Sequence, residues 1–142
     1  MPTRKADASW DGDLKGGKGT IKLGSGAWSG GYSFGTRFEN APGSNPEELL
    51  GAAHAACFSM ALAAGLGKAG FQPQNVSTTA DVSIDKVGDG FKITKIVLHS
   101  TARVPNIDEG KFREIANATK TGCPVSQALS ATPIELDAKL AK

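Results

Sequence analysis

One segment of the chain stays apolar for longer than any other. Between Glu48 and Lys68 no side chain is Lys, Arg, Asp or Glu, and Ala and Gly recur throughout. Asn45 suits the N-cap of a helix, and Pro46 suits its first position, where a missing N–H costs little. The pattern predicts one long helix over about 45–68. Because this helix is apolar on nearly every side, we expect it to be buried in a core or at a permanent interface.

The segments before and after this helix alternate between apolar and polar residues, as strands do. The strands expected from this alternation are residues 3–10, 17–23, 32–34, 76–87, 91–104 and 133–140. Asp108 suits the N-cap of a further helix over 109–120, and Cys123-Pro124 suits the start of a short one. This order of elements predicts an α+β fold with mostly antiparallel sheets and a long central buried helix.

The length of 142 residues favours a single domain with room for a real core. We expect N-terminal strands over about 1–40, the central helix over about 45–68, and C-terminal strands and helices over about 76–142. The net charge of +2 is small and no Lys/Arg stripe is present, which argues against a nucleic-acid partner. The first residues lead into a polar segment, so no signal peptide is expected. The long helix carries a histidine and begins with two glutamates, so no membrane span is expected either.

The two cysteines lie in different settings. Two cysteines without a signal peptide indicate a reducing compartment. Cys57 lies in the middle of the apolar helix, where an inert core thiol is the commoner interpretation; a reactive one needs a nearby cation, because burial raises a thiol pKa. Cys123 precedes Pro124 and so lies near an N-cap, where free amides favour a thiolate. His54 lies three residues before Cys57, but a fourth ligand is missing, so a metal site is not favoured.

Two motifs together carry a family resemblance. Residues 45–60 read Asn-Pro-Glu-Glu-Leu-Leu-Gly-Ala-Ala-His-Ala-Ala-Cys-Phe-Ser-Met, and residues 122–127 read Gly-Cys-Pro-Val-Ser-Gln. This pair resembles the osmotically inducible OsmC branch of the OsmC/Ohr family, and residues 8–13 and 79–83 are similar as well. The resemblance implies a cytoplasmic, thiol-dependent peroxidase that reduces organic hydroperoxides in stress defence. It also implies an intertwined homodimer, and neither a cofactor nor a metal is expected.

The resemblance also assigns roles to residues. It implies that Cys57 is the peroxidatic cysteine and Cys123 the resolving cysteine, with a redox-active disulfide between them that an external thiol or dithiol reduces. Glu47 carries the carboxylate role. Arg37 is our choice for the arginine that completes the site, because it lies just before the long helix; Arg103 and Arg113 are the alternatives.

Helix geometry gives a separate argument for a dimer. If the helix is continuous, Glu47 and Cys57 are about 15 Å apart along its axis, at about 1.5 Å per residue. Glu47 of one chain then cannot touch Cys57 of the same chain. If both serve one site, Glu47 must come from a second subunit, which two antiparallel copies of the helix around a two-fold axis would supply.

Two rival functions and several minor interpretations remain open at this point. The protein could be a non-enzymatic redox sensor or binding module in which the two cysteines switch its conformation, or a structural dimer with inert cysteines. We expect Phe58, Met60 and the aromatic residues of 32–38 to form an apolar channel for alkyl hydroperoxides. His54 is interpreted as a packed interface residue rather than a base, and Ser126 as a cap of the short helix.

Overall fold

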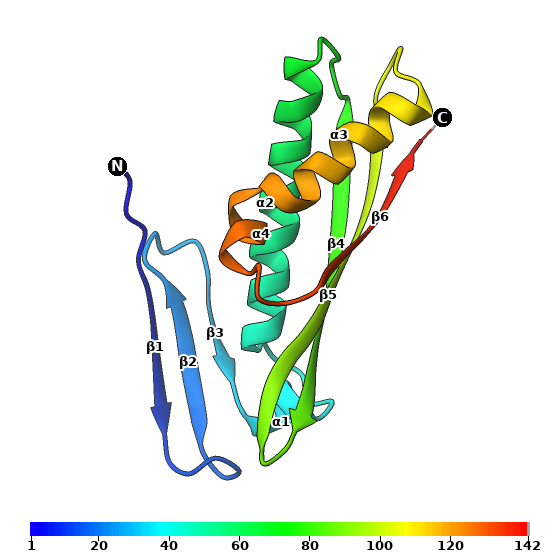
Figure 1. Cartoon of the computed structure of the whole chain (residues 1–142). Coiled ribbons are helices and arrows are strands. Elements are labelled where there is room, and N and C mark those ends of the chain that lie inside the picture. The colour runs from blue at the N-terminus through cyan, green and yellow to red at the C-terminus, as the bar shows by residue number, and fades with distance from the viewer. Residues whose placement is uncertain (142) are drawn as a thin grey trace. The chain divides into compact units, whose positions relative to one another are not determined.

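The computed structural model describes residues 1–141, which fall into two compact units, Met1–Leu49 (unit 1) and the described residues from Leu50 onward (unit 2). Figure 1 traces the chain through both units. Each unit contains a three-stranded sheet, and three of the four strand pairings are antiparallel. The predicted α+β class with mostly antiparallel sheets is confirmed.

Unit 1 is built on a meander of three short strands in the order β1-β2-β3. The strands are β1 (Ala6–Asp11), β2 (Lys18–Leu23) and β3 (Ser29–Tyr32). The rings of Trp10 and Tyr32 lie 5.3 Å apart across this sheet. Gly19 lies beneath the Tyr32 ring, and any side chain at this position would collide with that ring and with the Ser9 carbonyl. The sheet thereby holds an aromatic cluster close to its backbone.

The prediction of a third strand over 32–34 was wrong in position. The strand ends at Tyr32, and α1 (Phe34–Phe38) follows it as a short helix. A capping box starts this helix: the Thr36 N–H donates to Ser33 Oγ at 3.2 Å, and the Ser33 N–H donates to Thr36 Oγ1 at 2.8 Å. These bonds outweigh the weak alternation of three residues.

Unit 2 contains a larger sheet in the order β4-β5-β6. Its strands are β4 (Asn75–Val87), β5 (Gly90–Arg103) and β6 (Ile134–Leu140). The predicted hairpin of β4 and β5 is confirmed as antiparallel. β6 pairs with β5 in parallel, with Ile96 opposite Ile134. A parallel pair needs a crossover connection, which α3 (Glu109–Gly122) and α4 (Pro124–Ala128) supply.

The long helix is α2 (Pro46–Lys68), close to the predicted bounds. Asn45 caps it as expected, because its Oδ1 accepts the Glu48 N–H at 2.8 Å. By length and composition α2 could cross a membrane, a test that the core helices of soluble proteins also pass. Within the single chain one face of α2 is buried, and an opposite face of small or apolar residues is exposed: Ala52, Ala53, Ala56, Met60 and Ala64. Burial of this second face at a permanent interface stays a prediction.

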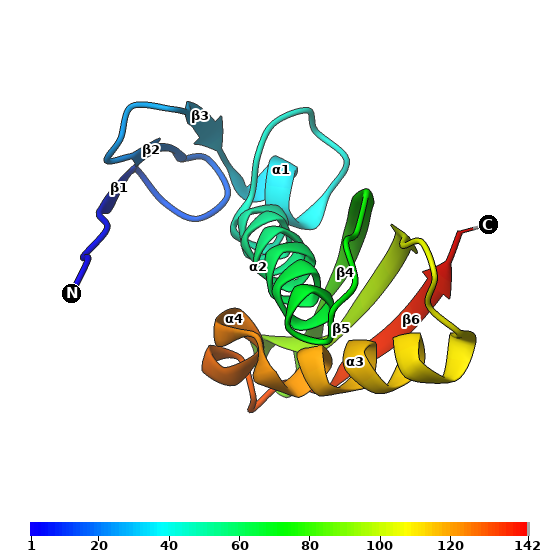
Figure 2. The same ribbon diagram turned by 90° about the horizontal axis from the view of Figure 1, so that it is seen from above.

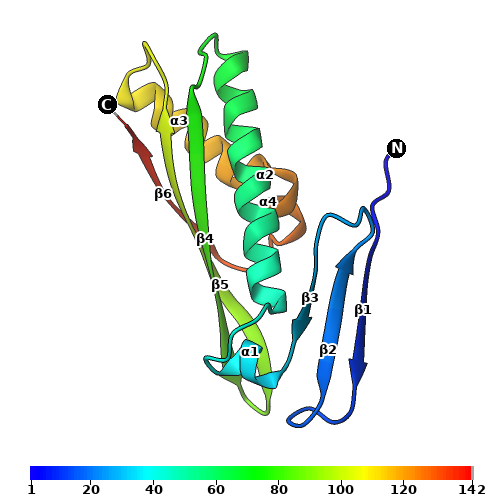
Figure 3. The same cartoon turned by 180° about the vertical axis from the view of Figure 1, so that it is seen from behind.

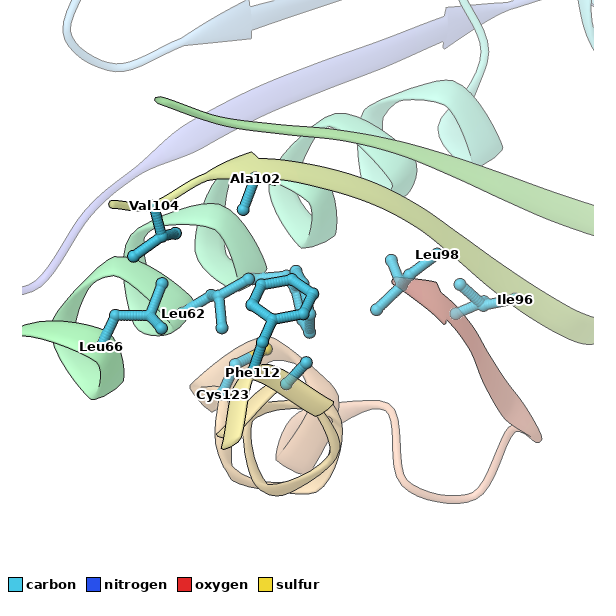
Figure 4. Close-up of a cluster of buried hydrophobic side chains, with 10 residues drawn as sticks. Leu62, Leu66, Ile96, Leu98, Ala102, Val104, Phe112 and Cys123 are labelled. Atoms are coloured by element: carbon cyan, nitrogen blue, oxygen red, sulfur yellow. The ribbon is translucent and has the colours of Figure 1, made fainter. Parts of the chain in front are cut away.

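α2 and α3 pack on one face of the unit 2 sheet (Figure 2). The residues of β5 alternate, so Ile96, Leu98 and Ala102 face these helices while His99 and Thr101 face away. Figure 3 shows the second face of the sheet, whose strands carry mostly polar residues. The buried core, shown in part in Figure 4, consists of Phe58, Leu62, Leu66, Ile96, Leu98, Ala102, Val104, Phe112, Ala116 and Cys123.

Two features fix α2 against the sheet near Cys57. Gly51 lets the helix approach β4, since a Cβ at this position would lie 3.3 Å from the Ala80 carbonyl oxygen. Ser59 donates to Thr78 Oγ1 at 2.7 Å, and Thr78 shares a further hydrogen bond of 3.0 Å with Ser100. These hydrogen bonds satisfy the hydroxyl groups between α2 and the sheet, and they help to fix where α2, and with it Cys57, lies against the sheet.

Candidate functional site

The two cysteines lie together in unit 2, although 66 positions separate them in the sequence (123 − 57). Cys57 is half-buried on α2, and Cys123 is buried at the junction of α3 and α4, where it belongs to the core cluster shown in Figure 4. Both thiols are free, and Cys123 lies close enough to Cys57 to raise the pKa of its thiol. Two thiols that meet can lose two electrons and two protons together and form a disulfide. Sequence reasoning named both residues, but it did not establish how close they lie.

The surroundings of Cys57 act on its ionisation in opposite directions. Burial is the largest influence and raises the pKa of the Cys57 thiol. A hydrogen bond from the Val125 backbone lowers this pKa, while the hydrogen bond and the charge of Cys123 raise it. Unit 2 by itself therefore holds Cys57 as a thiol rather than a thiolate, and a reactive Cys57 needs a cation from elsewhere.

Cys123 is the first member of a buried chain of hydrogen bonds. Its Sγ accepts the Ser126 N–H at 3.3 Å and donates to Ser126 Oγ at 3.1 Å. Ser126 Oγ lies 2.7 Å from Nε2 of His54, which is fully buried on α2. The expected N-cap position of Cys123 is confirmed. The link to His54 was missed; the signal for it was a single histidine inside an apolar helix.

Arg37 and Glu47 form a charged pair in unit 1. Arg37 Nε donates to both carboxylate oxygens of Glu47 at 3.1 and 3.2 Å, and its Nη2 donates to Oε1 at 2.8 Å. The Glu47 side chain is 7% exposed and that of Arg37 is 36% exposed. A bidentate pair of this kind fixes the plane of the guanidinium as well as its position.

The start of α2 and the short helix α1 hold this pair in place. Arg37 lies in α1, and Glu47 lies in the first turn of α2. Asn45 joins the two elements, because its Nδ2 donates to the Thr36 carbonyl at 3.0 Å while its Oδ1 caps α2. The guanidinium also lies 5.3 Å from the centroid of the Phe38 ring. The residue that caps the long helix thus also positions the arginine.

A cavity of about 240 Å³ in unit 1 opens beside Arg37. Its walls are mainly aromatic and apolar, and the guanidinium is the charged group in its lining. The lining of the cavity includes Trp10, Leu14, Tyr32, Phe34, Arg37 and Phe38. Such a cavity accepts an apolar body with one polar end that the arginine can bind.

Other expectations met different outcomes. Phe58 was expected in an apolar channel, but its side chain is fully buried in the unit 2 core. Met60 is 77% exposed on the single chain. Of the alternative arginines, Arg113 forms an exposed ion pair with Glu109 on α3, and Arg103 is exposed at the end of β5. Within residues 1–141, no group of three or more His, Cys, Asp or Glu side chains could hold a metal ion.

Comparisons with known proteins point in one direction. The family described as OsmC-like protein matches residues 39–139. The peroxiredoxin OsmC of Escherichia coli K12 is 56% identical over 138 residues, which is 96% of each chain. The organic hydroperoxide resistance protein of Xanthomonas axonopodis is 32% identical over 87 residues, 61% of this chain and 59% of the relative.

Solved structures give the same picture of the fold. A crystal structure of an organic hydroperoxide resistance protein from Elizabethkingia anophelis has a TM-score of 0.77 at 23% identity, and covers 100% of this chain and 97% of its own. An OsmC-like protein from Mycoplasma pneumoniae has a TM-score of 0.76 at 17% identity, with 99% of both chains covered. At these identities the likeness shows the fold.

Proposed function

We infer the function from the family, since this chain belongs to the OsmC family. We propose that it is a thiol-dependent peroxidase that reduces organic hydroperoxides to alcohols. The names of its relatives, a peroxiredoxin and an organic hydroperoxide resistance protein, support this activity. The single observation that carries the proposal is the proximity of two free cysteines, since Cys123 lies close enough to Cys57 to raise the pKa of its thiol.

The first step of the proposed reaction takes place at Cys57. Its thiolate attacks one peroxide oxygen and the O–O bond breaks, which oxidises the sulfur to a sulfenic acid. The alkoxide takes up a proton and leaves as the alcohol. Arg37, oriented by Glu47, supplies the positive charge that favours the Cys57 thiolate and the developing charge on the leaving oxygen.

The second step takes place between the two cysteines. Cys123 attacks the sulfenic sulfur, the S–S bond forms, the S–O bond breaks, and the hydroxide leaves as water after it takes up a proton. The sulfur of Cys123 is oxidised and that of Cys57 is reduced in the same event. An external thiol or dithiol then reduces the disulfide and returns both thiols.

We propose that, in a homodimer, the Arg37–Glu47 pair of one subunit lies close to the cysteines of the other subunit. Glu47 and Cys57 lie on one continuous helix, about 15 Å apart along its axis at about 1.5 Å per residue. The exposed face of α2, lined by Ala56 and Met60, is the kind of surface that a second copy covers. Two such helices packed antiparallel bring Glu47 of one subunit toward Cys57 of the other. Residues 1–142 then act as one OsmC-like domain within an intertwined dimer in the reducing cytoplasm.

The aromatic cavity beside Arg37 supports a preference for alkyl hydroperoxides. Its walls suit the apolar body of such a substrate, while Arg37 binds the peroxide end. Hydrogen peroxide has no apolar body and gains nothing from these walls. We therefore expect the protein to prefer organic hydroperoxides over hydrogen peroxide.

The proposed function is tested by intact mass under non-reducing conditions. Reduced protein receives one equivalent of an alkyl hydroperoxide, and we expect a rapid loss of about two hydrogens, the mark of a disulfide. Cys57→Ser should show no thiol oxidation, and Cys123→Ser should stop at the gain of one oxygen. No mass change in the wild type, or oxygen on Met alone, would remove the chemical basis of the proposal.

The rival functions predict other results. Inert cysteines predict slow thiol labelling and no peroxide-driven disulfide. A pure sensor forms the disulfide but does not turn over. With a dithiol reductant present, consumption of many equivalents of hydroperoxide per subunit separates the enzyme from the sensor.

A further inference from the structure

The buried chain from Cys123 to His54 links a reacting thiol to a base. Cys123 Sγ lies 3.1 Å from Ser126 Oγ, which lies 2.7 Å from His54 Nε2. Cys123, Ser126 and His54 are 1%, 3% and 0% exposed. All three residues belong to unit 2 and come from α2 and the α3–α4 junction. We propose that Ser126 and His54 take the proton from Cys123 when it attacks the Cys57 sulfenic acid.

One orientation of the hydrogen bonds around Ser126 allows a proton to pass from Cys123 to His54. The Ser126 N–H already donates to Cys123 Sγ at 3.3 Å, so this N–H steadies the sulfur as its charge grows. A serine hydroxyl has one proton to donate. If the Cys123 thiol donates to Ser126 Oγ, the Ser126 hydroxyl proton points to His54 Nε2. The thiol proton can then pass to oxygen while the hydroxyl proton passes to nitrogen.

The imidazole of His54 is in the neutral form that can accept a proton. Burial lowers the pKa of the His54 imidazole, so the ring is neutral at pH 7 and has a free lone pair. None of the ion pairs among residues 1–141 includes His54. The titratable groups that face His54 along these hydrogen bonds are Cys123 and, beside Cys123, Cys57. A neutral base beside a thiol serves proton transfer, whereas a charged imidazolium would not.

The second ring nitrogen of His54 argues against a purely structural role. Nδ1 is buried, and no group within residues 1–141 forms a hydrogen bond with it. A buried polar atom without a partner destabilises the fold, and an apolar side chain of similar size would avoid this cost. The imidazole is therefore explained better by its bond to Ser126 than by packing.

The proposed step balances in atoms and electrons. The S–H bond of Cys123 breaks, the S–S bond forms, and the S–O bond of the sulfenic acid breaks. The electron pair of the Cys123 thiolate forms the S–S bond, and the S–O pair leaves with the hydroxide, so the oxidation state of Cys123 rises by one and that of Cys57 falls by one. The leaving hydroxide gains the proton equivalent that His54 held, so water leaves and His54 ends neutral. This inference rests on the proposed peroxidase function and refines its second step. Ser126 touches the reacting sulfur, while His54 acts through Ser126.

The proposal is tested by two rates measured separately, first that of sulfenic acid formation and second that of disulfide formation. Reduced protein is mixed with an alkyl hydroperoxide, quenched at intervals, and analysed by intact mass for the sulfenic acid and for the disulfide. We expect Ser126→Ala and His54→Gln to slow disulfide formation tenfold or more, so that the sulfenic acid accumulates, while the first rate changes less than about twofold. Ser77→Ala removes an exposed hydroxyl from β4, away from this chain of hydrogen bonds, and should leave both rates at wild-type values.

The pH profile gives a readout that loss of packing would not produce. With an internal base, disulfide formation in the wild type should be nearly independent of pH between about 6.5 and 8. In His54→Gln the thiol must ionise to solvent, so the rate should rise about tenfold per pH unit below the usual thiol pKa of about 8.5. The wild-type profile needs no variant, so misfolding of a variant leaves the test intact.

The outcomes separate the two proposals. Wild type that forms neither a sulfenic acid nor a disulfide would overturn the peroxidase function, and the relay with it. A normal first phase with an unchanged second phase in both variants would overturn the relay alone, as would a wild-type second phase that rises tenfold per pH unit. Accumulation of the sulfenic acid together with the steep profile of His54→Gln would support the relay.

Discussion

The two parts of the proposed site solve different electrostatic problems. In unit 1, Arg37 and Glu47 are both charged, and Arg37 remains 36% exposed. In unit 2, Cys123, Ser126 and His54 are buried and joined by hydrogen bonds, and Cys57 is half-buried close to Cys123. Charge is stabilised where water and a bidentate partner are present, and neutral groups are kept where neither is available.

This difference indicates how a buried thiol can become reactive. Burial raises the pKa of Cys57, so unit 2 alone makes it a poor nucleophile. A buried arginine without a partner would be costly, so the cation is held in unit 1 by Glu47. Reactivity in this proposal depends on bringing the charged part of one subunit to the neutral part of another.

The largest expected effect comes from separating the subunits. Ala56→Glu places a charge in the exposed face of α2, and we expect it to prevent dimer formation and to remove nearly all peroxidase activity. Ala56 is exposed on the single chain, so the fold of the chain should tolerate the change. Light scattering and hydroperoxide consumption measure the two effects. Asn117→Glu adds the same charge to α3 and should change neither; an active monomeric Ala56→Glu would contradict the dimeric site.

A smaller effect is expected from removing the cation alone. Arg37→Met should slow sulfenic acid formation about a hundredfold, in line with the loss of one stabilising donor. Disulfide formation in unit 2 should keep its rate, as stopped samples analysed by mass would show. Arg113→Met removes an arginine from an exposed ion pair and should leave both rates unchanged.

The Arg37→Met variant needs a control for a loss of folding stability. Arg37→Met leaves Glu47 buried without its partner; because Arg37 is 36% exposed, the cost should lie below the about 3–5 kcal/mol of breaking a fully buried pair. Arg37→Lys keeps the charge but loses the bidentate geometry, so it should fold better and recover part of the rate. If Arg113→Met slowed the first step instead, the assignment of Arg37 would be wrong.

The smallest expected effect concerns stability and pH. The pKa of His54 is lowered by burial, so below its usual value of about 6.5 the unfolded chain binds a proton that the folded chain does not. Stability should therefore fall as pH decreases below about 6.5, by at most about 1.4 kcal/mol per pH unit from this group. His54→Met should lose this contribution, measured as the difference in urea unfolding between pH 5.5 and pH 7.5. Equal pH dependence in both proteins would contradict it.

Local patterns predicted much of the fold. The caps at Asn45 and Asp108 and the uncharged stretch before Lys68 gave the two main helices, because these signals act within a few residues. The prediction of a strand over 32–34 was wrong because the Ser33–Thr36 capping box was not recognised. This box has Thr at the N3 position, where the usual sequence signature has Glu or Gln. The parallel pairing of β6 depends on tertiary packing, which no short segment encodes.

The candidate site was predictable in its members but not in its contacts. The family resemblance named Cys57, Cys123, Arg37 and Glu47. The proximity of the two thiols and the link from Ser126 to His54 join segments more than sixty residues apart, and no periodicity in the sequence carries that information. Sequence reasoning set His54 aside because a thiolate needs no base to cleave a peroxide; the base is useful to the second thiol.

The parallel strand β6 has a consequence for the order of folding. The β1–β3 meander and the β4–β5 hairpin close through neighbouring segments, whereas Ile96 meets Ile134 across 38 positions (134 − 96). Such long-range pairing closes slowly, because chain entropy is lost before contacts compensate for it. The His54–Ser126 bond spans 72 positions and depends on the same crossover. A nascent chain would thus acquire its proton relay only at the end of folding.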